Sequence, residues 1–150
     1  MNMIEPLPLQ HSWPLWEQPR HFDLGHILNC AVADAIQPSG IGHLGLQHAG
    51  VWECDLATET LIWSGGVYDI FGLARGLQVS RQEALAIYSE DSRSKLERLR
   101  NYAIRHKRGF TLDIDIHASV VGEVRHVRLI AAPVCEDDQV IRMHGVKLIV

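Results

Sequence analysis

Apolar and polar residues alternate between positions 110 and 117, and this alternation predicts a β-strand with one buried face. The apolar residues of the segment are Phe110, Leu112, Ile114 and Ile116. A return strand with the same period follows Gly122. Pairing Leu112 with Leu129 and Ile114 with Val127 brings the apolar side chains of both strands onto one face.

The charged residues of this hairpin fall on its opposite face. The same register sets Asp113 against Arg128 and Asp115 against His126. We therefore expect one face of the hairpin to join the core, and the two carboxylates to point away from it.

A second hairpin and a short helix are predicted between Gly50 and Gly72. Residues 51–55 and 60–63 have the composition of two short strands joined by a turn. Ser64 is suited to the N-cap of the helix, and Gly72 to the left-handed position at its end. The apolar residues of this helix, which share one stripe, are Val67, Ile70 and Phe71.

Two further helices and a last strand complete the predicted core. Ser80 and Glu83 have the spacing of a capping box, which starts a short helix that runs through Tyr88. Asp91 or Ser92 is expected to cap a longer, basic helix that ends at Gly109. Its inward residues are Leu96, Leu99 and Ala103. In the last strand, residues 140–150, the apolar positions change phase, so we expect a bulge near Gly145.

The N-terminal third has a different organisation. Residues 1–20 hold four prolines without a sustained period and are expected to form an extended or mobile arm. Residues 21–48 are read as an amphipathic helix and a glycine-rich linker. The helix either covers the sheet of its own chain or packs against a second copy, and we favour the second, a homodimer. The expected interface residues are Leu24, Ile27, Leu28, Ala31, Val32 and Ala35.

Composition fits one soluble domain with an N-terminal extension. The chain has 150 residues, 47% of them hydrophobic, and no apolar run long enough for a membrane span or a signal peptide. Three widely spaced cysteines indicate reduced thiols in a cytoplasm. The net charge is −4, although residues 93–108 are strongly basic. We read that basic segment as a solvated helix face and do not expect nucleic acid as a partner.

The order of several motifs resembles a PAS sensor domain, in particular the subgroup whose first hairpin reads Trp-x-Trp-Asp and Trp-Ser. The matching residues are Trp52, Asp55, Thr58, Trp63, Ser64, Phe71, Gly72 and Leu73. Residues 88–91 and 122–127 match two later motifs of that subgroup. The chain departs from the pattern where Cys54 replaces the second Trp and His126 a late Trp, and in its last six residues.

The resemblance implies an α+β fold, with a five-stranded antiparallel sheet over residues 49–150 and helices on one face. It also implies a cavity between sheet and helices that either accepts a small molecule or is filled. We expect its lining to be Trp52, Cys54, Trp63, Phe71, Leu85, Leu96, Leu99, Leu112, Ile114, Val127, Leu129 and Met143. A small thiol at Cys54, in place of an indole, would leave space for a ligand.

Cofactors of PAS relatives can be compared with the residues present. Flavin photosensors of the light-oxygen-voltage type need Asn-Cys-Arg on a core helix, whereas Asn29-Cys30 is followed by Ala31 in the N-terminal extension, so a flavin adduct is not expected. Haem-binding relatives place a His on the long helix, where His106 is the one candidate, and we expect it to be exposed. The spacing of the nine histidines does not suit a metal site.

These observations predict a non-enzymatic module that senses or transmits a signal, through dimerisation and with a possible small-molecule ligand. Its output is expected to reach a partner protein in trans or an output domain beyond this sequence. One alternative is a ligand-free protein-interaction module. A second is a small cone-shaped enzyme of the ketosteroid-isomerase type, which would need an acidic side chain inside the cavity.

Overall fold

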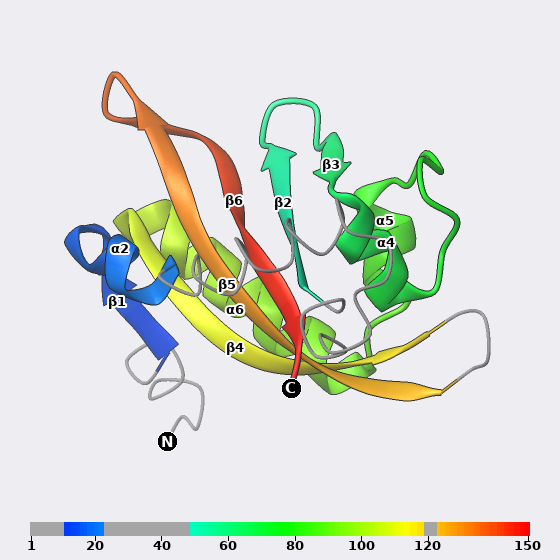
Figure 1. Ribbon diagram of the computed structural model, residues 1–150. Helices are drawn as coiled ribbons and strands as arrows, with labels where there is room; N and C mark the ends of the chain where they lie inside the picture. Colours follow the sequence, from blue (N-terminus) through cyan, green and yellow to red (C-terminus); the bar gives the residue numbers. More distant parts are fainter. Residues whose placement is uncertain (1–10, 23–48, 119–122) are drawn as a thin grey trace.

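Antiparallel pairing joins six strands into one sheet, in the order β1-β4-β5-β6-β2-β3 (Figure 1). The computed structural model describes residues 11–22, 49–118 and 123–150. The strands are β1 (Ser12–Pro14), β2 (Ala49–Asp55), β3 (Leu61–Trp63), β4 (Arg108–His117), β5 (Val124–Glu136) and β6 (Gln139–Ile149). The helices are η1 (Leu15–Glu17), α2 (Gln18–His21), α4 (Gly65–Phe71), α5 (Arg81–Leu85) and α6 (Glu90–His106).

The predicted register of the β4–β5 hairpin is confirmed. Leu112 pairs with Leu129 and Ile114 with Val127, and all four side chains are buried. On the other face, Arg128 Nε donates to Asp113 Oδ1 over 2.8 Å. His126 Nδ1 lies 2.6 Å from Asp115 Oδ1. The alternation of side chains along a strand was therefore enough to fix this pairing.

Helices α4, α5 and α6 cover one face of the sheet and enclose the main hydrophobic core. The inward stripe of α6 contains Leu96, Leu99 and Ala103, as predicted. Its N-cap, however, is Ser89 and neither Asp91 nor Ser92. Ser92 instead accepts a hydrogen bond from the backbone N–H of Asp115, which fastens the first turn of α6 to β4.

The other helix signals are partly confirmed. Gly72 ends α4 with a φ of 72°, and Ser80 and Glu83 form the predicted capping box at the start of α5. Ser64 occupies the N-cap position of α4, but its hydroxyl accepts a hydrogen bond from the N–H of Val51. This serine therefore ties α4 to β2. Helix α6 ends at Lys107, whose φ of 55° is left-handed, and Gly109 already belongs to β4.

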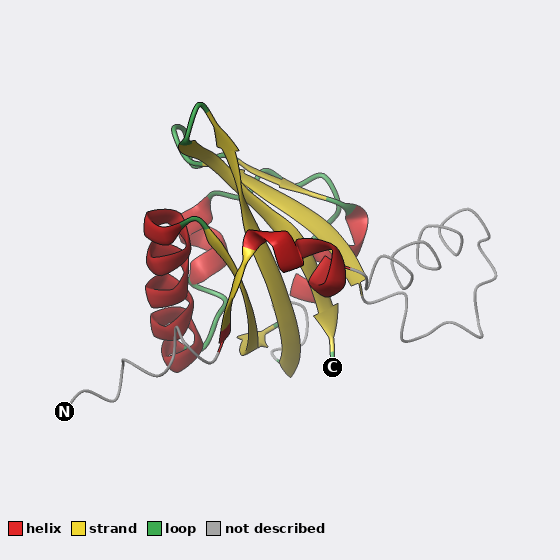
Figure 2. Cartoon of the chain, turned by 90° about the vertical axis from the view of Figure 1, so that its left-hand side faces the viewer, coloured by secondary structure: helices red, strands yellow, loops and turns green. Residues whose placement is uncertain are grey.

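The sixth strand comes from the segment that the sequence suggested to be an extended or mobile arm. Strand β1 pairs with the start of β4, and Trp13 lies opposite Gly109. The chain then forms η1 and α2 on the face of the sheet that α6 leaves uncovered (Figure 2). Trp13 is buried there with Ile130 and Val146, and its indole N–H donates to Thr111 Oγ1 over 3.1 Å. The second face of the sheet is therefore covered in part, around Ile130 and Val146.

The bulge predicted near Gly145 is wrong. Strand β6 passes regularly through Gly145, which pairs with both Ala131 and Trp52, and the shift in register lies at Val134 and Cys135. A side chain at Gly145 would collide with the carbonyl of Ile130, so the glycine permits close approach of the strands. The apolar positions of β6 change phase because Val146 belongs to a second hydrophobic cluster, which it forms with Trp13 and Ile130 on the opposite face of the sheet.

The helix predicted for residues 22–37 lies almost entirely outside the described residues. This applies to each expected interface residue, namely Leu24, Ile27, Leu28, Ala31, Val32 and Ala35. Within the ranges that are described, no helix combines the length and apolar character needed to cross a membrane.

Replacing Trp13 tests whether the N-terminal segment stabilises the domain. Trp13→Ala removes a buried indole that stacks on His21 with ring centroids 4.1 Å apart. We expect the free energy of unfolding to fall by about 3 kcal/mol. Urea denaturation followed by circular dichroism measures this change. Trp16→Ala is the matched control, because Trp16 is 72% exposed, and an equal effect of the two variants would contradict the role of Trp13.

Candidate ligand cavity

A cavity lies between the sheet and helices α5 and α6. The volume that the centres of water molecules can occupy is about 60 Å³. The whole empty space, including the part at the mouth that is open to solvent, is about 520 Å³. Its lining residues come from every strand except β1. They are Trp52, Cys54, Leu61, Trp63, Arg81, Ala84, Leu85, Tyr88, Leu96, Arg100, Phe110, Leu129, Met143 and Lys147.

The residues predicted to line a cavity fall into two groups. Those that line it are Trp52, Cys54, Trp63, Leu85, Leu96, Leu129 and Met143. The others, Phe71, Leu99, Leu112, Ile114 and Val127, are buried in the same core without lining the cavity. The second group is enclosed where α6 packs on strands β4 and β5 and where α4 packs on strands β2, β3 and β6. Whether a ligand occupies the cavity stays a prediction.

Lys147 is the most unusual group in the cavity wall. It is only 5% exposed, and on β6 it pairs with Gly50 of β2 on one side and with Leu129 of β5 on the other. Four aromatic rings surround its ammonium group, and their centroids lie 5.0–5.9 Å from Nζ. The rings belong to Trp52, Trp63, Phe71 and Tyr88. Their electron-rich faces stabilise a cation but do not replace a counter-ion.

The electrostatic state of Lys147 follows from this environment. Burial lowers the pKa of its ammonium group to about 7, and the thiol of Cys54 opposes the shift. Within the described ranges, no Asp or Glu forms an ion pair with Lys147. A fraction of the molecules therefore carries a neutral amine at neutral pH, and the remainder carries a buried charge without a carboxylate partner.

Cys54 lies on the same wall and faces inward, as expected for the residue that replaces an indole. Burial raises the pKa of the Cys54 thiol, while the positive charges of Arg100 and Arg81 oppose the rise. The thiol therefore remains protonated and unreactive at neutral pH. Its small side chain leaves space in the cavity that an indole would fill.

Two arginines contribute charge to the helical side of the cavity. The capping box places Arg81 in the first turn of α5, where its guanidinium pairs with Glu97 of α6. Arg100, one turn after Glu97, approaches Glu59 to 4.0 Å. Both carboxylates thus serve an arginine at the rim, and the cavity itself keeps an excess of positive charge.

The two tryptophans of the first hairpin contribute unused hydrogen-bond donors. Trp52 and Trp63 are directly opposite on β2 and β3, so their side chains share the core face. In the described part of the chain, both indole N–H groups are buried without an acceptor. Groups of this kind are rare in folded proteins and call for a partner.

Several functional groups of the cavity were missed by sequence reasoning, above all Lys147, Arg81, Arg100 and Tyr88. A signal for Lys147 was present, because Met143 was placed inside the core and Lys147 has the same parity on the strand. The apolar residues Val146 and Leu148 obscured it. No comparable signal marks Arg81 or Arg100, since both read as ordinary solvated helix residues.

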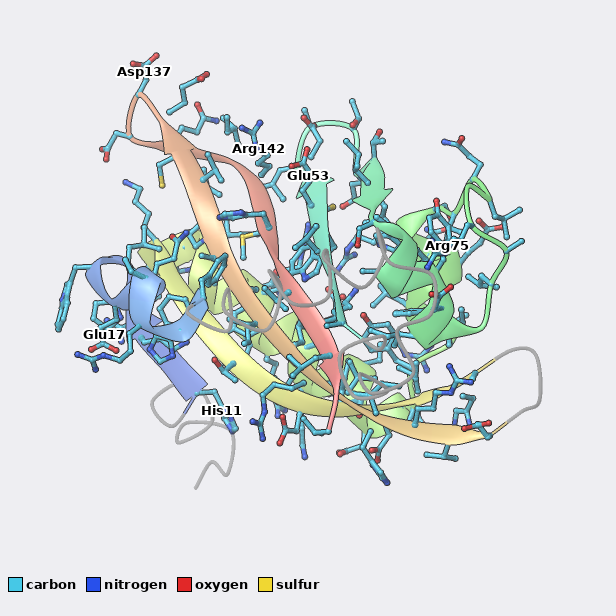
Figure 3. The ribbon with its side chains drawn as sticks, in the orientation of Figure 1. His11, Glu17, Glu53, Arg75, Asp137 and Arg142 are labelled. Atoms are coloured by element: carbon cyan, nitrogen blue, oxygen red, sulfur yellow. The ribbon has the colours of Figure 1, made fainter. Side chains whose placement is uncertain are left out.

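The haem candidate His106 and the carboxylates of the described residues are absent from the cavity lining. His106 is exposed and contacts Tyr102, with ring centroids 4.3 Å apart and ring planes tilted by 43°, whereas Asn29 and Cys30 fall outside the described residues. No metal-binding group of His, Cys, Asp or Glu occurs among the residues described. Glu53, labelled in Figure 3, stands between Trp52 and Cys54 on β2 and therefore points to the other face.

Comparisons with known proteins identify the fold. No family model and no curated protein matches the chain. An RNA-binding light-oxygen-voltage receptor is 16% identical with a TM-score of 0.60, and the match covers 68% of this chain but 29% of the receptor. The N-terminal domain of a diguanylate cyclase with a PAS/PAC sensor from Marinobacter aquaeolei is 13% identical with a TM-score of 0.61, covering 67% of this chain and 94% of that domain.

A sensory box histidine kinase/response regulator from Burkholderia thailandensis gives a similar match, with 17% identity, a TM-score of 0.59, and coverage of 69% and 78% of the two chains. At these identities the likeness is one of fold. The chain has the α+β fold of PAS domains, as its motifs suggested, and the sheet is extended to six strands by β1. The solved neighbours include sensor domains of kinases and cyclases.

The pH dependence of stability tests the burial of Lys147. The pKa of Lys147 is about 7 in the folded chain against an ordinary 10.5, so the unfolded state binds more protons between these values. Stability of the wild type therefore rises with pH across this window. We expect Lys147→Met to raise the free energy of unfolding by on the order of 3 kcal/mol at pH 6 and by much less at pH 10.

Urea denaturation at a series of pH values measures this difference. Lys95→Met is the matched control, because the side chain of Lys95 on α6 is 42% exposed and pairs with Asp91. A stability difference between wild type and Lys147→Met that does not change with pH would contradict the assignment.

Proposed function

We propose that this protein is a non-enzymatic, signal-sensing PAS module that binds a small molecule in the cavity between the sheet and helices α5 and α6. The cavity around Lys147 is the observation that carries the proposal. A core that served only for packing would gain stability from an apolar residue at this position, since a buried cation without a counter-ion is unfavourable. Contact between a ligand and Lys147 would explain why a lysine, and not an apolar residue, occupies this position.

Catalysis is not supported by the chemistry of the lining. An enzyme of the ketosteroid-isomerase type needs an inward carboxylate, and the lining residues include neither Asp nor Glu. Asp113 and Asp115, the carboxylates of the β4–β5 hairpin, pair with Arg128 and His126 on the outer face. The solved neighbours with sensor functions agree with a binding role.

The route of the signal follows from the elements that meet at the cavity. A ligand would contact α5 and α6 on one side and β2, β5 and β6 on the other, so its binding would alter how the helices lie on the sheet. We propose that this change reaches a partner protein in trans, or an output domain, in a cytoplasmic homodimer. The amphipathic segment around residues 24–35 would form the contact between the two copies.

A ligand-free interaction module is the second candidate. Ile62 on β3 and Val51 on β2 are 58% and 45% exposed in the described structure, on the face opposite the cavity. These side chains could contribute to a protein contact without a ligand. A purified protein that carries no ligand and binds none would favour this candidate.

Cys54→Trp tests the cavity directly. An indole at this position would fill the space beside Lys147, so we expect any small molecule that copurifies with the wild type to be lost. Native mass spectrometry detects the ligand, and circular dichroism checks the fold. Cys54→Leu fills less of the cavity and is the second variant, in case Cys54→Trp does not fold. Cys135→Trp is the control, because Cys135 is exposed. Retention of the ligand by a folded Cys54→Trp would contradict the cavity as its site.

A charge introduced into the apolar stripe of the predicted N-terminal helix tests the homodimer. Leu28→Glu would place a carboxylate in the apolar stripe, and we expect the dimer to dissociate at least tenfold more readily. Sedimentation velocity measures the change. Asn29→Glu adds the same charge beside the stripe and should leave the dimer intact. A dimer of equal strength in both variants would exclude this segment as the contact.

A further inference from the structure

The cavity contains positive charge and lacks the negative charge that would balance it. The other titratable residues that line the cavity with Lys147 are Cys54 from β2, Tyr88 before α6, Arg81 from α5 and Arg100 from α6. None of them is a carboxylate. Burial raises the pKa of both Cys54 and Tyr88, so neither supplies an anion near neutral pH.

The carboxylates nearest to these cations are held outside. Glu97 pairs with Arg81, and Glu59 lies at the rim near Arg100 with half of its side chain exposed. Lys147 lies deeper than either arginine and is reached by neither glutamate. A buried ammonium group of this kind is satisfied either by deprotonation or by an anion that enters the cavity.

The unpaired hydrogen-bonding groups of the cavity wall also favour a ligand with acceptor atoms. The indole N–H groups of Trp52 and Trp63 are donors without an acceptor, and both residues belong to the ring cage of Lys147. The remainder of the wall is apolar, with Leu61, Leu96 and Met143 among its members. A ligand that complements this wall therefore combines an acceptor-rich anionic group with an apolar body.

We propose that the ligand is a small monocarboxylic acid whose carboxylate pairs with Lys147 Nζ and whose apolar body packs against the leucine, methionine and aromatic side chains of the cavity. This inference rests on the proposed function and specifies its ligand. The size of the cavity limits the ligand to a few non-hydrogen atoms, because about 60 Å³ open to water-sized centres holds a few waters. A planar carboxylate fits a site bounded by ring faces and capped by N–H donors.

Proton linkage gives the proposal a distinctive signature. Pairing with a carboxylate raises the pKa of Lys147 above its value of about 7 in the empty cavity, so binding takes up a proton when the pH is above 7. Affinity is therefore full below pH 7 and falls as the pH rises from there. Burial raises the pKa of Cys54 and of Tyr88, so both keep their protons near neutral pH, and Lys147 is the group of the cavity wall whose titration produces the change.

The test uses isothermal titration of the full chain with four acids, each compared with its uncharged amide. The acids are acetate, propionate, butyrate and isobutyrate, which stay within the size that the cavity allows. We expect at least one acid to bind at least tenfold more tightly than its amide at pH 6.5, with proton uptake at pH 8 detected in buffers of different ionisation enthalpy. Lys147→Met should abolish the preference for the acid, and Lys95→Met should retain it.

The outcomes distinguish failure of the carboxylate proposal from failure of the ligand-binding proposal. An amide that binds as tightly as its acid, or an acid preference that survives in Lys147→Met, would overturn the carboxylate proposal and leave a ligand-binding module. Failure of all four acids to bind, together with a neutral copurifying ligand, would do the same. Failure of every acid and amide, in a protein that carries no ligand, would overturn both proposals.

Discussion

Strand β6 has apolar partners on both of its faces, and this constraint determines the character of the interior. Residues alternate along a strand, so Val146 and Leu148 reach the cluster around Trp13, while Met143 and Lys147 must enter the main core. The lysine cannot turn outward without removing two apolar side chains from the opposite cluster. The N-terminal segment thus holds a cation inside the domain, although it lies on the other side of the sheet.

The parts of the fold that sequence reasoning predicted were those governed by local rules. The β4–β5 register followed from a period of two, and Gly72 and the Ser80 capping box followed from backbone chemistry at helix ends. Strand β1 was missed because three residues pair with a strand almost one hundred positions away. Nothing in a proline-rich segment of that length indicates its partner, and only the buried Trp13 distinguishes it.

The candidate site was predicted in its apolar part and missed in its polar part, for a physical reason. An apolar residue that belongs to a core is recognised by type, so Trp52, Trp63 and Met143 were placed well. A charged residue is assigned to solvent by the same reasoning, and its burial depends on what covers the strand from both sides. Lys147 was therefore invisible until the second cluster was known, even though its parity on β6 pointed inward.

The two ends of β4 are closed by segments from different parts of the chain. Strand β1 covers residues 108–110 of β4. The turn before α6 covers the other end of β4, where Tyr88 forms a β-bridge with Ile116. In the same turn, Ser89 forms a backbone hydrogen bond with Asp115, and Ile87 forms one with His117. A long strand at a sheet margin is a template on which other chains can assemble. Here short local covers shield that margin, and the opposite margin is a strand of three residues. The domain is thereby protected against uncontrolled edge-to-edge association, and strand β1 limits this association as well as supporting the core.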